Sequence, residues 1–137
     1  MLTENNIISA VCNYLTLEGY SNIESKNTKQ QGIDIEATSP DGSKLYIEAK
    51  GETSSKPNSK RFGKPFANGQ PIVHVSKAIY TALKLCETLK GDLPIKVGIA
   101  FPVEEKHKEL LSYIKETLKD LDISVFWVNA ELNVKVE

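Results

Sequence analysis

The spacing of apolar residues along the chain predicts three helices. In each of them apolar side chains recur every three or four positions, so that they share one face of a helix. The first helix is expected to begin at Thr3, a favourable N-cap, and to end before Gly19. The predicted helices span residues 3–18, from between 71 and 76 to 90, and 103–120.

Strands are predicted where apolar and polar residues alternate, or where apolar residues run together. Two alternating runs, 33–37 and 44–49, flank the sequence Ser39-Pro40-Asp41-Gly42. This sequence is typical of a hairpin turn, because proline presets φ and glycine accepts a positive φ. Further strands are predicted at 20–24, 95–101, 123–128 and 130–136. The density of apolar residues in 95–101 and 123–128 is typical of buried strands.

The hairpin turn also predicts which residues of the two strands face each other. If Pro40 and Asp41 are the central pair of a type I turn and Gly42 is a left-handed bulge residue, Asp34 lies directly opposite Glu48. Strand alternation places Lys50 on the same face as Glu48. The pattern therefore predicts two carboxylates and an ammonium group close together.

This grouping of charges has a chemical interpretation and a structural one. Two facing carboxylates repel each other unless a cation lies between them, and a hard ion such as Mg²⁺ binds carboxylates while keeping places for water and phosphate oxygens. A neighbouring lysine can orient or help deprotonate a water molecule, or offset charge on a phosphate. The alternative is a solvated hairpin face with cross-strand ion pairs.

The sequence Gly32-x-Asp34-Ile35, followed by Glu48-x-Lys50-Gly51, resembles the PD-(D/E)xK phosphodiesterase superfamily. The resemblance implies an α/β, restriction endonuclease-like fold with a mixed central β-sheet flanked by helices, in the order α-β-β-β-α-β-α-β-β. It implies that Asp34 and Glu48 bind Mg²⁺ or Mn²⁺, that the carbonyl of Ala49 helps to hold the ion, and that Lys50 assists the attacking water. The chain departs from the family pattern at Ile33, where the name-giving proline often stands.

An acid on the first helix often joins the metal site in the resembling family, and Glu4 is the candidate for that role. Glu4 lies one turn before Ile8 on the apolar stripe, so it is expected to point toward the protein. The alternative is that Glu4 is merely stabilised by the positive end of the helix dipole, and Glu18 is a weaker candidate. His74 and Lys77, near the start of the second helix, are left out of the catalytic set.

Positive charge is concentrated in the segment 51–70, which follows Lys50 directly. The formal net charge of the whole chain is −1, which argues against a protein that coats nucleic acid without discrimination. In this segment the four basic residues outnumber the single acid, and we expect them to hold a phosphate backbone. The alternative is a solvated loop that contacts nothing. The basic residues are Lys56, Lys60, Arg61 and Lys64.

Length predicts one domain spanning residues 1–137, and the lack of export and membrane signals predicts that it is located in the cytoplasm. Hydrophobic residues make up 40% and charged residues 26% of the 137 residues, as in ordinary globular proteins. No apolar run approaches the roughly 20 residues of a membrane span, and the start of the chain lacks the order of a signal peptide. Cys12 and Cys86 fall in helical patterns, where reduced cysteines pack as small hydrophobes.

Together these features predict a Mg²⁺-dependent nuclease that hydrolyses phosphodiester bonds, with DNA as the expected nucleic acid. A homodimer is one way for such an enzyme to cut two strands. The main alternative is a non-catalytic module of the same fold that binds nucleic acid or a protein partner. A third is an interaction protein with a charged hairpin, in which the carboxyl groups of Asp34 and Glu48 lie too far apart to share a metal.

Overall fold

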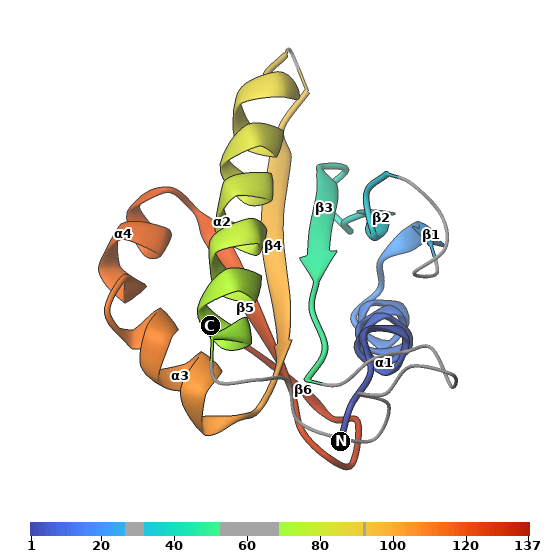
Figure 1. Ribbon diagram of the computed structural model, residues 1–137. Helices are drawn as coiled ribbons and strands as arrows, with labels where there is room; N and C mark the ends of the chain where they lie inside the picture. The colour runs from blue at the N-terminus through green and yellow to red at the C-terminus, as the bar shows by residue number, and fades with distance from the viewer. Residues whose placement is uncertain (27–31, 53–68, 92) are drawn as a thin grey trace.

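The fold is built around a six-stranded sheet whose strands lie in sequence order, β1 to β6 (Figure 1). The computed structural model describes residues 1–26, 32–52, 69–91 and 93–137. Within these ranges the elements are α1 (Glu4–Leu17), β1 (Ser21–Ser25), β2 (Ile35–Thr38), β3 (Lys44–Ala49), α2 (Gln70–Thr88), β4 (Ile95–Pro102), α3 (Glu105–Ser112), α4 (Lys115–Asp120), β5 (Ile123–Val128) and β6 (Val134–Val136).

The sheet is mixed, as predicted. β1, β2 and β3 pair antiparallel, β3, β4 and β5 pair parallel, and β6 returns antiparallel to β5. A short turn can join only antiparallel neighbours, whereas parallel strands need a longer connection, which α2 supplies between β3 and β4. The predicted α/β class, with helices flanking a mixed central sheet, is therefore confirmed.

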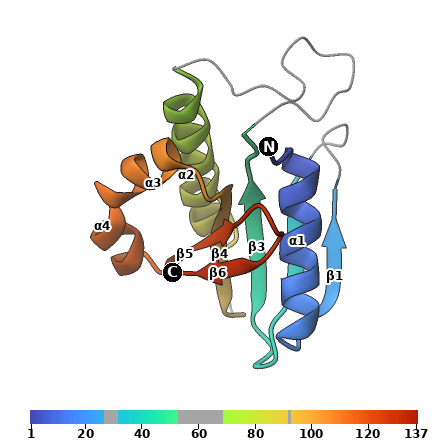
Figure 2. The same ribbon diagram turned by 90° about the horizontal axis from the view of Figure 1, so that it is seen from below.

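Two apolar clusters lie on the two faces of the sheet. α1 packs Ile7, Val11 and Leu15 against one face, where they meet Ile35 and Ile47 of the hairpin. α2, α3 and α4 cover the other face (Figures 1 and 2). Each fully buried aliphatic side chain of this kind stabilises the fold by roughly 1.5–3 kcal/mol. β4 and β5 contribute residues to both clusters, which explains their continuous apolar sequences.

The hairpin has the predicted register. Ile35 pairs with Ile47, and the pairing continues without a shift along the two strands. The Gly42 N–H donates to the Ser39 carbonyl over 2.9 Å, and Gly42 has a φ of +90°. The Asp41 carboxylate accepts hydrogen bonds from the hydroxyls of Ser39 and Ser43 and from the Ser43 N–H, which together hold its pKa well below its usual range.

One helix differs from its prediction. The region 103–120 contains two helices, α3 and α4, with the break at Tyr113 and Ile114. Ile114 has φ −123° and ψ 14°, outside the helical range, and its N–H donates to the carbonyl of Leu111, three residues back. The apolar residues keep helical spacing across the break, so the sequence pattern reads as one helix. In the part of the chain that the structure describes, no helix has the length and apolar character to cross a membrane.

Candidate functional site

The hairpin brings Asp34 to the end of β3. Asp34 directly precedes β2, and the pairing of Ile35 with Ile47 sets Asp34 opposite Glu48, as predicted. The Ala49 N–H donates to Oδ2 of Asp34 over 2.8 Å, and the Asp34 carbonyl accepts from the Lys26 N–H over 2.9 Å. The Asp34 carboxylate is thus fixed against the backbone of the Glu-x-Lys triplet.

Glu48 lies in direct contact with Asp34. The pKa of Glu48 is raised to about 8, first by burial and then by the hydrogen bond to Asp34 and the charge of Asp34. The protonated Glu48 carboxyl therefore donates to the Asp34 carboxylate at neutral pH. Two carboxyl groups this close cannot both ionise unless a cation offsets the repulsion. The expectation for an ordinary charged hairpin, carboxyl groups too far apart to share a metal, is not met.

Glu4 faces the same space from the first turn of α1. Thr3 caps this helix, and Asn6 completes the capping box through hydrogen bonds of 2.8 and 3.1 Å. The pKa of Glu4 is raised to about 7, first by burial and then by the charge of Asp34, while the charge of Lys50 opposes the rise. The helix dipole alone would lower this pKa, so burial and Asp34 outweigh the dipole. Glu18 is the C-cap at the opposite end of the helix.

Gly51 fastens the N-terminal end of α1 to the end of β3. A Cβ atom at Gly51 would lie 2.4 Å from the Glu4 nitrogen and 2.7 Å from the Thr3 carbonyl carbon, so only glycine allows this approach. The Glu52 N–H donates to the Leu2 carbonyl, and the Leu2 N–H donates to Oε1 of Glu52, both over 2.9 Å. Both ribbon views show the N-terminus beside the end of β3 (Figures 1 and 2). This contact positions Glu4 near Lys50.

Lys50 leaves the sheet at the same point. The Lys50 N–H donates to the Ala100 carbonyl of β4 over 3.0 Å. This hydrogen bond between parallel strands fixes the backbone from which the Lys50 side chain extends. Its charge lowers the pKa values of Glu4 and Glu48, which places its ammonium group near both carboxyl groups. The structure therefore brings together Glu4, Asp34, Glu48 and Lys50, the four residues predicted to be catalytic.

Two residues of α2 complete the surroundings of the site. The Thr81 hydroxyl donates a hydrogen bond to the Glu48 carboxyl group, which partly opposes the rise of its pKa. The His74 side chain hydrogen-bonds to the Gly51 backbone, and burial, followed by the charge of Lys50, lowers the pKa of His74 to about 4. The two residues are seven positions apart, two turns of one helix face. His74 lies outside the predicted catalytic set, and no sequence pattern marks Thr81.

The donor set suits a hard divalent ion. Asp34 and Glu48 are carboxyl groups in contact, and Glu4 faces them, which is the oxygen chemistry that Mg²⁺ and Mn²⁺ prefer. Among the described residues, however, no three or more His, Cys, Asp or Glu side chains are arranged as a preformed cluster for a metal. The raised pKa of Glu48 instead favours its protonated form, which hydrogen-bonds to Asp34. The metal-binding role of the Ala49 carbonyl stays a prediction.

Part of the prediction lies outside the described ranges. Lys56, Lys60, Arg61 and Lys64, the residues expected to hold a phosphate backbone, fall within 53–68. The structure describes the chain on either side of this segment, from Glu52, which is fixed to Leu2, and from Gln70, where α2 begins. The contact of these four residues with nucleic acid stays a prediction.

Comparison with known proteins identifies the fold. It is shared with a solved protein. The structure is similar to the 1.60 Å crystal structure of an XisH family protein from Nostoc punctiforme PCC 73102, with a TM-score of 0.57 over 95% of this chain and 96% of that chain. The sequences are 15% identical, so the likeness shows the fold alone. No family model matches the chain, and no curated protein sequence matches it.

Proposed function

We propose that this protein is a nuclease that depends on Mg²⁺ or Mn²⁺ and hydrolyses phosphodiester bonds, with DNA as the expected substrate. The observation that carries the proposal is the contact of the Asp34 and Glu48 carboxyl groups beside Lys50. These residues match the Asp and Glu-x-Lys pattern of the PD-(D/E)xK superfamily, and the α/β fold with a mixed sheet agrees with that resemblance.

In this proposal Asp34 and Glu48 hold the ion, with Glu4 and the Ala49 carbonyl as further oxygen donors. A bound divalent ion supplies positive charge, which lets neighbouring carboxyl groups ionise together and favours negative charge on a phosphate. The Ala49 N–H keeps Oδ2 of Asp34 in place, and Thr81 orients the Glu48 carboxyl group. These hydrogen bonds are expected to limit the rotation of both carboxyl groups.

Lys50 acts on the water and the phosphate. As the ammonium, it orients the attacking water or offsets the charge that develops on the phosphate oxygens; as the neutral amine, it accepts the proton of that water and becomes the ammonium. His74 lies nearby and is neutral at pH 7, because burial and Lys50 lower its pKa to about 4. Lys50 therefore supplies positive charge to the proposed substrate site, and the basic residues of the segment 51–70 are expected to add to it.

The experiment is a cleavage assay on supercoiled plasmid, single-stranded DNA, branched DNA and RNA, with Mg²⁺, Mn²⁺ or EDTA. We expect cutting of at least one DNA substrate that EDTA abolishes. Lys50→Ala should reduce the rate by about 100-fold or more, the usual contribution of a group that assists proton transfer. Lys44→Ala is the matched control, because Lys44 lies at the opposite end of β3, where its side chain donates to the Thr38 hydroxyl and its backbone N–H donates to the Pro94 carbonyl.

Two results would contradict the proposal. One is cutting by Lys50→Ala at the wild-type rate. The other is binding of the same substrates by the wild-type protein without cutting under any metal condition, which would favour the non-catalytic binding module. Sedimentation of the protein with and without DNA would test the expected homodimer, in which two sites act on two strands.

A further inference from the structure

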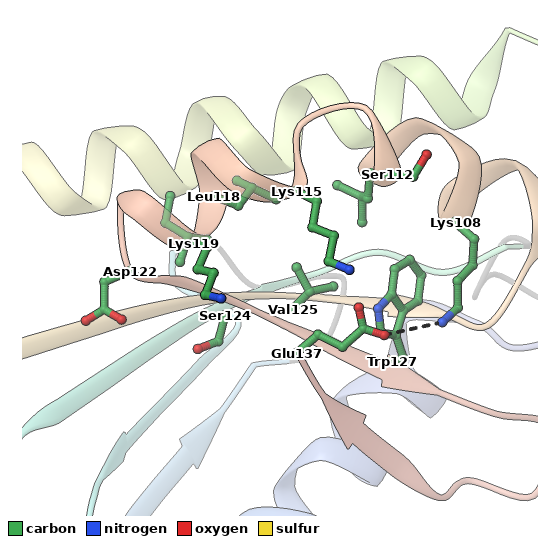
Figure 3. A pocket seen from close by; sticks show the side chains of 12 residues that line it. Lys108, Ser112, Lys115, Leu118, Lys119, Asp122, Ser124, Val125, Trp127 and Glu137 are labelled. Atoms are coloured by element: carbon green, nitrogen blue, oxygen red, sulfur yellow. Dashed lines mark ion pairs between the residues drawn. The ribbon is translucent and has the colours of Figure 1, made fainter.

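A second candidate binding site lies between α3, α4 and β5, and none of its lining residues belongs to the proposed nuclease site. It is a cavity of about 450 Å³ (Figure 3). Its apolar lining comes from Leu111, Leu118, Ile123, Val125 and Trp127. Lys115 and Lys119 extend over it from α4, and Figure 3 shows both side chains reaching toward β5. The cavity therefore combines an apolar floor with a cationic rim.

The indole of Trp127 provides an unused hydrogen-bond donor in this cavity. Trp127 is only 3% exposed, and among the residues that the structure describes its buried Nε1 atom has no hydrogen-bond partner. Buried indole N–H groups normally find an acceptor. In Figure 3 the nitrogen-bearing edge of the ring is turned toward the space between Lys115 and Glu137. The Nε1 atom exposes less than 1 Å², so an acceptor atom of a ligand would satisfy it once a neighbouring side chain of the lining moves aside.

The charges around the cavity favour an anion. Lys108 lies 3.7 Å from Oε1 of Glu137 and 4.4 Å from the centre of the Trp127 ring, so the Glu137 charge is already offset and one ring face is covered. Lys115 and Lys119 are one helical turn apart, where like charges repel each other. Neither forms an ion pair within the described ranges. Asp122 is the other acid of the lining.

We propose that this cavity binds a small aromatic anion. The aromatic ring lies on the apolar floor and meets the free edge of Trp127, since aromatic pairs favour edge-to-face contacts. The anionic group, a carboxylate or a phosphate, is held by Lys115 and Lys119 and accepts the indole N–H. A volume of about 450 Å³ is in the range of pockets for small molecules.

The test uses Trp127 as its own reporter. It is the single tryptophan of the chain, so the ¹H–¹⁵N spectrum contains one indole N–H signal. The probes are 2-naphthoate, 2-naphthyl phosphate and the neutral 2-naphthamide. We expect at least one anion to shift the indole signal to saturation, and the amide to bind at least tenfold more weakly. The anion that binds more tightly distinguishes a carboxylate from a phosphate ligand.

Paired variants test the role of the two lysines. The double variant Lys115→Gln, Lys119→Gln should weaken binding of the preferred anion at least tenfold while its amide spectrum stays that of a folded protein. The control is Lys44→Gln, Lys84→Gln, which removes two exposed lysines of β3 and α2, away from the cavity, and should leave the affinity unchanged. The proposal is overturned if neither anion shifts the indole signal, if the amide binds as tightly, or if the Lys115 and Lys119 variant binds normally.

Discussion

The raised pKa of Glu48 makes the stability of the metal-free protein depend on pH, and the direction of this dependence can be tested. Its pKa is about 8 in the folded state and 4.5 in the unfolded chain. Between these pH values the folded protein binds a proton that the unfolded chain has released. The stabilisation from this proton is therefore complete below pH 4.5 and is lost as the pH rises through about 8. A site in which stability is traded for metal binding would behave in this way.

Replacing Glu48 by Gln should stabilise the metal-free protein at high pH. The amide donates to Asp34 as the protonated carboxyl does, but it cannot ionise. In EDTA at pH 8.5 we expect the melting temperature of Glu48→Gln to exceed that of the wild type by about 3 °C, and the difference to vanish near pH 4.5. Thermal unfolding followed by circular dichroism measures both. A lower melting temperature for the variant at pH 8.5 would show that ionised Glu48 does not destabilise the folded protein.

At the scale of elements, the site depends on how α1 is attached to the end of β3. Gly51 lies where a side chain would collide with the backbone of Thr3 and Glu4, and the hydrogen bonds between Leu2 and Glu52 close the same contact. The backbone has little freedom to move aside because both strand and helix are packed on the core. Gly51 thus affects the site indirectly, because it lets the N-terminal end of α1 lie close to the end of β3.

Gly51→Ala should therefore displace α1 and lower stability. We expect a loss of about 1–3 kcal/mol in the free energy of unfolding, measured by urea denaturation, together with a rise in the exposure of Glu4. The control is Gly91→Ala, because a Cβ atom at Gly91 meets nothing within 4 Å. Equal stability of the two variants would mean that the contact between the N-terminal end of α1 and β3 does not constrain the fold.

The hairpin and its charges could be predicted because turn chemistry is local. Pro40, Asp41 and Gly42 determine the turn, the turn determines the register, and the register places Asp34 against Glu48. The approach of His74 and Thr81 could not be predicted in this way, because it depends on how α2 packs across the sheet. The break at Ile114 was also hidden, since apolar spacing continues through it.

At the scale of the whole molecule, the pattern of buried apolar positions determines the fold more than the identity of each residue does. An XisH family protein shares it over 95% of this chain with 15% identical residues. The layers of helix, sheet and helix need apolar residues at the right period, and many sequences satisfy this. Function must therefore be argued from the site residues. The predictions of one domain, of cytoplasmic location and of a DNA partner stay predictions.

The basic segment is expected to control the salt dependence of DNA binding. Each phosphate contact releases counterions, so removing contacts lowers the slope of log affinity against log salt concentration. For Lys60→Ala, Arg61→Ala we expect weaker DNA binding and a slope reduced by about 1–2, measured by fluorescence anisotropy between about 50 and 200 mM salt. The control is Lys84→Ala on α2. An unchanged slope would show that these two residues do not contact the phosphate backbone.

The most direct test of the central claim compares Asp34→Asn with Glu36→Gln in Mg²⁺-dependent plasmid cleavage. Both variants remove one carboxylate from the same hairpin, but only Asp34 contacts Glu48 and the backbone of Ala49. We predict that Asp34→Asn loses cleavage while its unfolding transition stays cooperative, and that Glu36→Gln cuts at the wild-type rate. Wild-type cleavage by Asp34→Asn would contradict the claim that these carboxyl groups form the metal site of a nuclease.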